Sequence, residues 1–264
     1  MIKLTVLHNE YESFVEEKAG FSILIELQEE KLKILFDTSM RDDIVVNVKK
    51  SNIDLSNIDY VVFSHGHYDH TDGMKFLKLS EIRHIIAHPD CFTKKFAKYK
   101  GKEIYIGIPF FLEYLQRETD VIQSKKPYWI SEKVVFLGEI PRKNNFEGQE
   151  SLGYLENHER DLILDDSALV IKGDDGLIII SGCSHSGICN IIEYAKGVCN
   201  EDKIAVVMGG FHLFDKNRVF HTIDYLQHQE IEKLFVAHCL SDFAFVEMEK
   251  TGALRIHTLE EFYF

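Results

Sequence analysis

The sequence lacks any apolar run that could cross a membrane. Its first segment, Met1–Leu7, is apolar but is followed at once by His8 and Asn9, which makes it too short for the apolar core of a signal peptide. No other stretch approaches the roughly 18 consecutive apolar residues that a membrane span needs. Low-complexity tracts and flexible linkers are also missing, and prolines number only 4. We therefore expect a cytoplasmic protein with no membrane partner.

Cysteine is scarce, and its spacing is irregular. The 5 cysteines are an odd number spread widely along the chain, and no two of them form a C-x-x-C pair. This spacing excludes a disulfide framework and a zinc ribbon. It is typical of a protein that works in a reducing compartment.

Basic residues are outnumbered, with 30 lysines and arginines against 43 acidic residues and a formal net charge of −13. Such a chain repels a phosphate backbone, so we expect no nucleic-acid partner. A small anionic substrate is still compatible with this charge, because a bound metal ion can reverse the local potential. The one basic concentration, Lys94–Lys102, is more typical of a solvated helix face than of a patch that attracts such a substrate.

Apolar residues are abundant enough to build a folded α/β protein. They make up 45% of the 264 residues, and aromatic residues make up 12%, so the chain can form a sizeable core. The length fits one large domain, which we place at residues 1–264. Between about residues 91 and 160 the apolar pattern loosens and three of the four prolines occur. We interpret this stretch as an inserted or elaborated region that lies over the functional site.

Runs rich in β-branched residues predict strands, and some of them pair as hairpins. Hairpins are expected at 20–37 and 167–181, and buried strands at 59–63, 83–88, 203–208 and 233–237. Helices are expected at 38–50, 72–79, 188–197, 219–226 and 242–250, with a last strand at 254–259. The helix from Ile188 is expected to stop at Gly197. The repeated order of a hairpin and βα units suggests two sheets with helices outside.

The segment Ser64–Gly73 reads S-H-G-H-Y-D-H-T-D-G and places four potential metal ligands within six residues. They lie between a buried strand and a helix. In a loop, side chains two residues apart can converge on one ion, which suits His65 and His67, whereas Asp69 and His70 can hold a second ion. Imidazole and carboxylate ligands suit zinc, iron or manganese, and the lack of thiolates in the run is unlike a closed structural zinc site. An ordinary histidine-rich surface loop is the alternative, and the spacing argues against it.

Two more histidines follow predicted buried strands. His185 lies in a tight turn between Gly182 and Gly187, at the end of a sheet where α/β proteins gather their ligands. We expect it to be a metal ligand rather than a capping or packing residue. His212 ends the run Gly209–His212, whose glycines permit close backbone approach to a substrate. It can bind substrate, act as an acid or ligate a metal.

These motifs together resemble the metallo-β-lactamase superfamily, whose local signature is the H-x-H-x-D-H run. The further segments Ser181–His185, Gly209–His212 and Ala237–Cys239 are similar to a subgroup of predicted metal-dependent hydrolases. Some archaeal relatives of that subgroup are named dihydropterin ribofuranosylaminobenzene phosphate synthases. The resemblance implies an α/β fold, namely the metallo-β-lactamase-like αββα four-layer sandwich, and a site for two divalent metal ions. It also implies that Asp37 supports the site and that His238 binds the second ion.

The chain departs from the commoner pattern of the superfamily at the residue that bridges the two metals. Relatives often show Gly-Asp where this chain has Gly182-Cys183. Cys183 can be a thiolate ligand or a small buried residue. Asp165 or Asp166 can supply the carboxylate instead.

We therefore expect a metal-dependent hydrolase of a small molecule such as an ester, a phosphoester or a lactone. His65, His67 and His185 would hold one ion, and Asp69, His70 and His238 the other, with zinc first and iron or manganese as alternatives. Asp69 would also orient the nucleophilic water, and His212 is the second candidate catalytic residue. A pterin-related synthase or transferase that releases phosphate on the same site is one alternative, and a metal-free binding protein is another. A di-iron redox enzyme is disfavoured, because such relatives typically carry Glu at the position of His67.

Overall fold

The computed structural model describes residues 1–9 and 20–264 of the chain. The chain divides into two compact units, each built from more than one stretch. Unit 1 consists of Met1–Ser124, Ser151–Asp165 and His257–Phe264, and unit 2 of Lys125–Glu150 and Asp166–Ile256. Each unit has a seven-stranded sheet of its own. The organisation as a single domain stays a prediction from the sequence.

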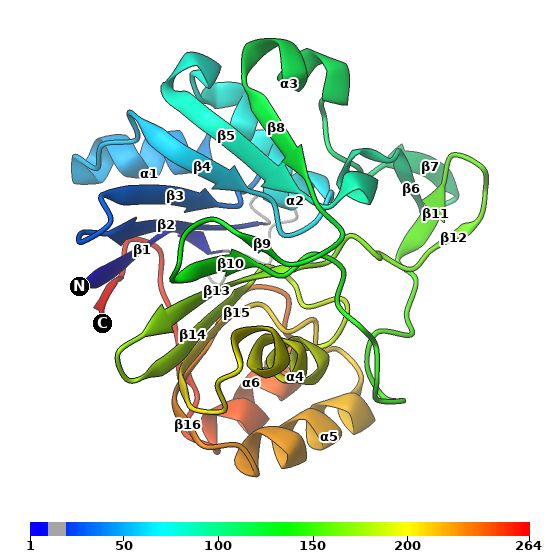
Figure 1. The fold of residues 1–264 in the computed structure, drawn as a ribbon. Coiled ribbons are helices and arrows are strands. Elements are labelled where there is room, and N and C mark those ends of the chain that lie inside the picture. The colour runs from blue at the N-terminus through cyan, green and yellow to red at the C-terminus, as the bar shows by residue number, and fades with distance from the viewer. Residues whose placement is uncertain (10–19) are drawn as a thin grey trace. The chain divides into compact units, whose positions relative to one another are not determined.

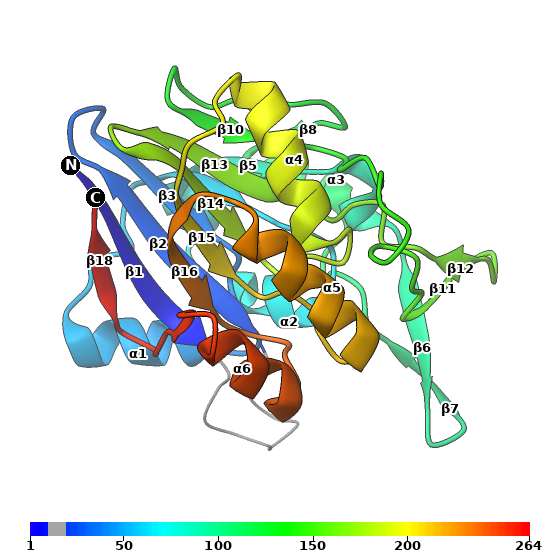
Figure 2. The same cartoon turned by 90° about the horizontal axis from the view of Figure 1, so that it is seen from below.

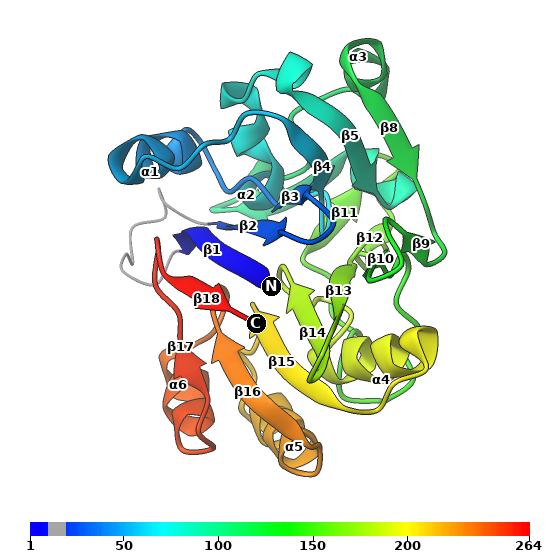
Figure 3. The same ribbon diagram turned by 60° about the vertical axis from the view of Figure 1, so that its left-hand side comes forward.

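The sheet of unit 1 has the strand order β18-β1-β2-β3-β4-β5-β8. Its strands are β1 (Ile2–Asn9), β2 (Phe21–Leu27), β3 (Leu32–Phe36), β4 (Ile58–Val62), β5 (Ile82–Ala87), β8 (Asp120–Gln123) and β18 (Glu261–Tyr263). Strands β2 and β3 form the predicted antiparallel hairpin, whereas β3, β4, β5 and β8 run parallel. The two ends of the chain meet at one edge, where β1 and β18 lie side by side (Figure 3) and the Ile2 N–H donates to the Phe264 carbonyl over 2.7 Å.

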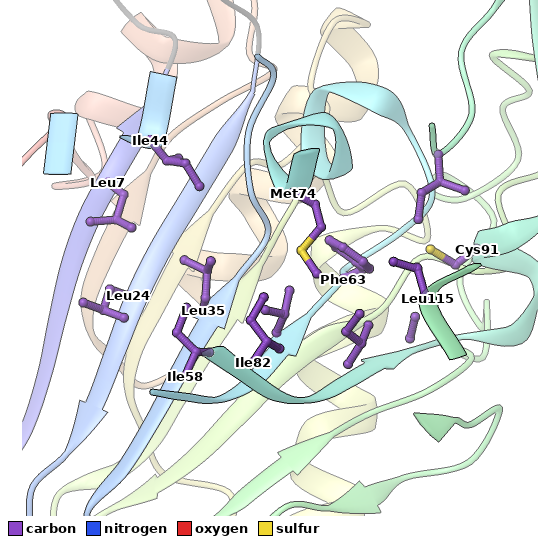
Figure 4. Packing of buried hydrophobic residues seen from close by; sticks show 14 of the residues in the cluster. Leu7, Leu24, Leu35, Ile44, Ile58, Phe63, Met74, Ile82, Cys91 and Leu115 are labelled. Atoms are coloured by element: carbon purple, nitrogen blue, oxygen red, sulfur yellow. The ribbon is translucent and has the colours of Figure 1, made fainter. Parts of the chain in front are cut away.

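Helices cover one face of this sheet and close a hydrophobic core. They are α1 (Asp43–Ser51), the short α2 (Tyr68–Thr71) and α3 (Leu112–Glu118), with 3₁₀ turns η1 (Asp72–Phe76), η2 (Leu79–Glu81) and η3 (Pro89–Phe92). Figure 4 shows Ile44 from α1, Met74 from η1 and Leu115 from α3 packed with residues of the strands. Phe63 lies in the same cluster and is fully buried. It directly precedes the histidine run, so the core fixes the start of that loop.

Two predicted helices of unit 1 differ from the structure. The helix expected at 38–50 begins only at Asp43, because Ser39 and Arg41 have φ angles of 59° and 59°, which a right-handed helix does not allow. The helix expected at 72–79 is the turn η1 followed by an extended Leu77. Both segments bend because they lie next to each other, with the Gly73 N–H donating to the Ser39 carbonyl over 3.0 Å.

A small four-stranded sheet also belongs to unit 1, in the order β12-β11-β6-β7. Figure 2 shows these strands gathered apart from the larger sheet. They are β6 (Lys95–Tyr99), β7 (Lys102–Tyr105), β11 (Gly153–Leu155) and β12 (Arg160–Asp161). The basic segment Lys94–Lys102 is therefore mainly strand β6 and its turn, and the prediction of a helix face there is wrong. Residues 91–160 contribute strands to all three sheets.

The sheet of unit 2 has the order β17-β16-β15-β14-β13-β10-β9. Its strands are β9 (Tyr128–Trp129), β10 (Val134–Phe136), β13 (Ala168–Gly173), β14 (Gly176–Ser181), β15 (Ile204–Gly209), β16 (Ile231–Val236) and β17 (Leu254–Arg255). Strands β13 and β14 form the second predicted hairpin, and β14, β15, β16 and β17 run parallel. The strand expected at 254–259 is shorter than predicted, because the chain leaves this sheet after Arg255 and forms β18 in unit 1.

Three helices connect these parallel strands and lie on the same side of the sheet (Figures 1 and 3). They are α4 (Ile188–Cys199), α5 (Lys216–Gln227) and α6 (Asp242–Glu249). Helix α4 continues through Gly197 and ends at Asn200, whose left-handed φ of 49° forms the cap. The predicted stop at Gly197 is wrong, because asparagine also adopts the capping conformation. The predicted α/β class is confirmed. Within residues 1–9 and 20–264, the helices lack the length and apolar character of a membrane span.

Candidate metal centre

Asp37 organises the histidine run of unit 1. Strands β3 and β4 are parallel neighbours, so the segments that follow them emerge at the same edge of the sheet. Asp37 follows β3 and accepts hydrogen bonds from the Ser64 N–H and hydroxyl, at 2.7 Å each, and lies 2.7 Å from His70 Nδ1. The carboxylate thus orients the His70 ring, as partners of metal-binding histidines do. The sequence resemblance implied this supporting role.

The four predicted ligands of unit 1 lie close together. His65 Nε2 is 3.0 Å from His67 Nδ1, and the His65 and His70 ring centroids are 4.3 Å apart. His70 Nε2 is 3.8 Å from a carboxylate oxygen of Asp69. The three histidines are buried, and the Asp69 side chain is 20% exposed. Unit 1 therefore gathers nitrogen and oxygen donors at one loop.

Burial keeps the imidazole of His67 neutral. Burial lowers its pKa to about 4, and this effect outweighs the opposing charge of Asp69. A neutral imidazole is the form that ligates a metal. Buried ring nitrogens of His65 and His67 that face each other at 3.0 Å fit a cation better than they fit an apolar core.

A buried ion pair holds the backbone of the same loop. Lys95 Nζ lies 3.1 Å from Asp161 and 2.8 Å from Asp165, and all three side chains are buried. The other Asp165 oxygen accepts the Gly66 N–H over 2.7 Å. Gly66 is tight against η3, because a Cβ there would lie 2.2 Å from the Cys91 carbonyl oxygen. The loop between His65 and His67 is therefore fixed from two sides.

A cavity of about 560 Å³ lies in unit 1 between residues 89–94 and 105–113. Its walls include Phe92 of η3 together with Phe110 and Phe111 before α3. Ile106 lies between the lining residues Tyr105 and Ile108, and its carbonyl accepts the Tyr68 N–H over 3.1 Å. Cavities of this size bind small molecules.

Unit 2 has a second set of donors at the ends of its parallel strands. His185 follows β14, His212 follows β15 and His238 follows β16, and these strands are neighbours in the sheet. The His185 and His212 ring centroids are 4.5 Å apart. Each loop also contains one non-glycine residue with positive φ, namely Ser184 at 57°, His212 at 46° and Cys239 at 53°. Such backbone conformations cluster at functional sites.

The glycines at 209 and 210 serve the packing of these loops. A Cβ at Gly210 would lie 2.4 Å from the Gly182 carbonyl oxygen and 2.9 Å from Cys239 Sγ. A Cβ at Gly209 would lie 2.1 Å from the Ser181 carbonyl oxygen. The sequence suggested that these glycines allow a substrate to approach, and in unit 2 they allow the neighbouring loops to approach.

Two donor groups of unit 2 are close enough to hold an ion. In one group, the ligand atoms of Cys183, His185 and His212 lie within 4.8 Å of one another. In the other, those of Cys183, His238 and Cys239 do so. Cys239 was not identified from the sequence as a possible ligand, although it directly follows His238. The donor chemistry of both groups fits a divalent metal.

The two aspartates considered as bridging ligands have other partners. Asp165 is engaged by Lys95 and Gly66 in unit 1, as described above. Asp166 belongs to unit 2 and accepts from the Ser186 N–H over 2.9 Å and from its hydroxyl over 2.5 Å. Burial raises the pKa of Asp166 to about 6, and the hydrogen bonds from Ser186 oppose that shift. These contacts fix loops and leave Cys183 as the donor shared within unit 2.

Comparisons with known proteins agree with the motifs. The chain is 35% identical over 249 residues to an uncharacterized protein of Methanocaldococcus jannaschii, covering 90% of each sequence. It is 32% identical over 281 residues to the 7,8-dihydropterin-6-methyl-4-(beta-D-ribofuranosyl)-aminobenzene-5'-phosphate synthase of the same organism, covering 97% of this chain and 94% of that one.

Its structure is similar to the crystal structure of a metal-dependent hydrolase of the beta-lactamase superfamily, Tm1679. The TM-score is 0.82 at 25% identity, over 100% of this chain and 99% of the other. Residues 15–198 match the metallo-beta-lactamase superfamily. Since this match spans more than half of the sequence, the chain belongs to the metallo-beta-lactamase superfamily.

Proposed function

We propose that this protein is a metal-dependent hydrolase of a small ester, phosphoester, lactone or similar molecule. The observation that carries the proposal is the buried histidine cluster of unit 1, in which His65 faces His67 at 3.0 Å and Asp37 orients His70. Membership of a superfamily that generally binds divalent metals supports it. The structural similarity to a metal-dependent hydrolase supports it further.

In the proposed site, His65, His67 and His185 bind one divalent ion, and Asp69, His70 and His238 bind the other. The assignment rests on the donor chemistry inside each unit and on the resemblance of the motifs to the superfamily. Zinc is the proposed metal, with iron and manganese as alternatives, because the set consists of imidazoles and a carboxylate. Such ions supply Lewis acidity and allow water to act as a nucleophile at neutral pH.

The side chains of the protein perform the proton transfers. The partly exposed Asp69 carboxylate can orient the attacking water and take its proton. His212 is half-buried, and no hydrogen bond to its Nδ1 is seen among the described residues. This ring can give a proton to the leaving group. The cavity of unit 1 would hold the rest of a small substrate, and its wall includes Lys94, whose Nζ pairs with Glu156.

A second candidate function is a pterin-related synthase or transferase that releases phosphate. The similarity to the M. jannaschii synthase, at 32% identity over 97% of this chain, favours it. In that reaction the same donors and His212 would assist the departure of phosphate from a sugar. The two functions differ in the acceptor, which is water in the first and a second organic substrate in the other.

A reaction screen separates these functions. The protein as purified, after chelation, and after zinc is restored would be tested on aryl phosphoesters, aryl esters and lactones. The same preparations would be tested with a phosphoribosyl donor and a dihydropterin or aminobenzoate acceptor. We expect hydrolysis that chelation abolishes and zinc restores. The rate of hydrolysis should fall at least about a hundredfold in Asp69→Asn and stay unchanged in the neighbouring control Asp72→Asn. Product formation only with the organic acceptor would select the synthase, and no reaction with either set would contradict both proposals.

A further inference from the structure

Cys183 belongs to both donor groups of unit 2. It follows β14 and is 3% exposed. Its sulfur is grouped with His185 and His212 in one and with His238 and Cys239 in the other. No other residue is common to these two groups. The Cys183 sulfur therefore lies within 4.8 Å of donor atoms from all three loops.

The loops are built to bring two sulfurs together. Cys239 Sγ accepts the His212 N–H at 3.3 Å and lies 3.7 Å from the Cys183 carbonyl oxygen. The left-handed φ of Cys239, 53°, places its side chain beside these loops at a cost in backbone strain. Only a glycine at 210 leaves room for this, because a Cβ there would lie 2.9 Å from Cys239 Sγ. Strain and tight packing thus support one arrangement of the two sulfurs.

The other three cysteines have ordinary structural surroundings. Cys91 packs in the hydrophobic cluster of unit 1. Cys189 and Cys199 are buried in α4. Burial raises the pKa of each of these thiols, which makes them poor ligands. Among the described cysteines, only Cys183 and Cys239 are members of a donor group with histidine, so the chain provides its own controls.

We propose that the Cys183 thiolate is the donor shared by the two groups of unit 2, and that Cys239 joins His238 in one of them. This inference rests on the proposed function, and it adds sulfur to the nitrogen and oxygen donors of the proposed site. Metal binding forms the metal–sulfur bond and releases the thiol proton to solvent. Thiolate ligands select zinc over manganese or magnesium, so the site belongs to a soft-metal class.

Cobalt substitution tests the proposal without an activity assay. The full chain would be stripped of metal and titrated with Co²⁺, since thiolate-bound cobalt has a sulfur-to-metal charge-transfer band in the near ultraviolet. We expect the band in the parent, its loss in Cys183→Ser and a weaker band in Cys239→Ser. The matched control Cys199→Ser should keep the parent spectrum. Competition with zinc should show that Cys183→Ser weakens zinc binding at least about tenfold.

A second measurement covers the case in which Cys183→Ser does not fold. The parent would be alkylated with iodoacetamide with and without Zn²⁺, and each cysteine would be followed by mass spectrometry. We expect zinc to protect Cys183 and Cys239 and to leave the labelling of Cys199 unchanged. Stoichiometric Co²⁺ binding without a sulfur band or protection would overturn the thiolate proposal and leave the proposed function standing. Failure of both metals to bind would overturn both.

Discussion

Lys95 differs from the other lysines of its segment in being buried. Lys94, Lys98, Lys100 and Lys102 are exposed, whereas the Lys95 side chain is 1% exposed between Asp161 and Asp165. Burial lowers the pKa of its ammonium group, but the two carboxylates outweigh burial and raise the pKa above its ordinary value. Because Asp165 also binds the Gly66 N–H, the ion pair links the small sheet to the histidine run.

Replacing this lysine should therefore destabilise unit 1 strongly. Lys95→Met leaves two buried carboxylates without their cation, and we expect the free energy of unfolding at pH 7 to fall by about 3–5 kcal/mol. Urea unfolding measures this change. The exposed control Lys98→Met should change the free energy by less than about 0.5 kcal/mol.

The pH dependence of this difference follows from the raised pKa. A group with a raised pKa in the folded state stabilises fully below its unfolded pKa, about 10.4 for lysine, and loses this contribution as pH rises through the folded value. The gap between parent and Lys95→Met should stay constant from pH 7 to about 10 and narrow above that. Equal stabilities at pH 7 would show that the ion pair does not hold the fold.

At the level of single residues, the sequence predicted what is local and missed what is long-range. The run from His65 to His70 could be interpreted because four donors stand within six residues. Lys95 pairs with Asp161 and Asp165, which lie 66 and 70 residues further along the chain. No local sequence pattern predicts such a pairing. Cys239 was missed because its sulfur reaches the other donors only through a left-handed backbone conformation.

Helix α4 offers a test at the level of one secondary-structure element. Gly197 lies inside the helix, and the space beside its Cα is empty, since a Cβ there would meet nothing within 4 Å. Glycine in an exposed helix position costs about 0.5–1 kcal/mol relative to alanine. Gly197→Ala should therefore raise the free energy of unfolding by about that amount in urea unfolding.

Gly187, just before the same helix, is the opposite case. Its φ is 98°, and a Cβ would lie 2.3 Å from Glu147 Cβ. Gly187→Ala should lower the free energy of unfolding, so the two alanine variants should move in opposite directions. A destabilising Gly197→Ala would mean that α4 ends where the sequence alone suggested.

Strands were predicted correctly where a short run of apolar, β-branched residues identifies them. The two hairpins and the buried strands β4, β5, β15 and β16 were identified from apolar, β-branched runs. Strand β1 was not assigned, because Ile2–Asn9 pairs with segments far along the chain, including β18. Helix α1 was predicted to begin too early, since tertiary contacts of Ser39 with Gly73 override local preference. The predicted boundaries of elements were therefore wrong where contacts with residues distant in sequence determine the backbone conformation.

At the scale of the whole molecule, the two units share one design. In unit 1 the donors follow β4, and Asp37, which orients one of them, follows the parallel strand β3; in unit 2 the donors follow β14, β15 and β16. Parallel strands present their carboxyl ends at one edge of a sheet, which is where α/β proteins place ligand sites. The order of these motifs along the sequence made the superfamily recognisable before the structure, whereas the substrate depends on side chains that no motif specifies.

Metal content per chain is the simplest test of a site for two divalent ions. Elemental analysis would be made on protein purified without added metal or chelator, beside Asp69→Ala, His185→Ala and the exposed-histidine control His228→Ala. We predict about two divalent ions per chain in the parent, fewer in the first two variants and no change in the control. A parent that holds no metal, even after reconstitution with zinc, would contradict a metal-dependent hydrolase and leave a binding protein on this fold.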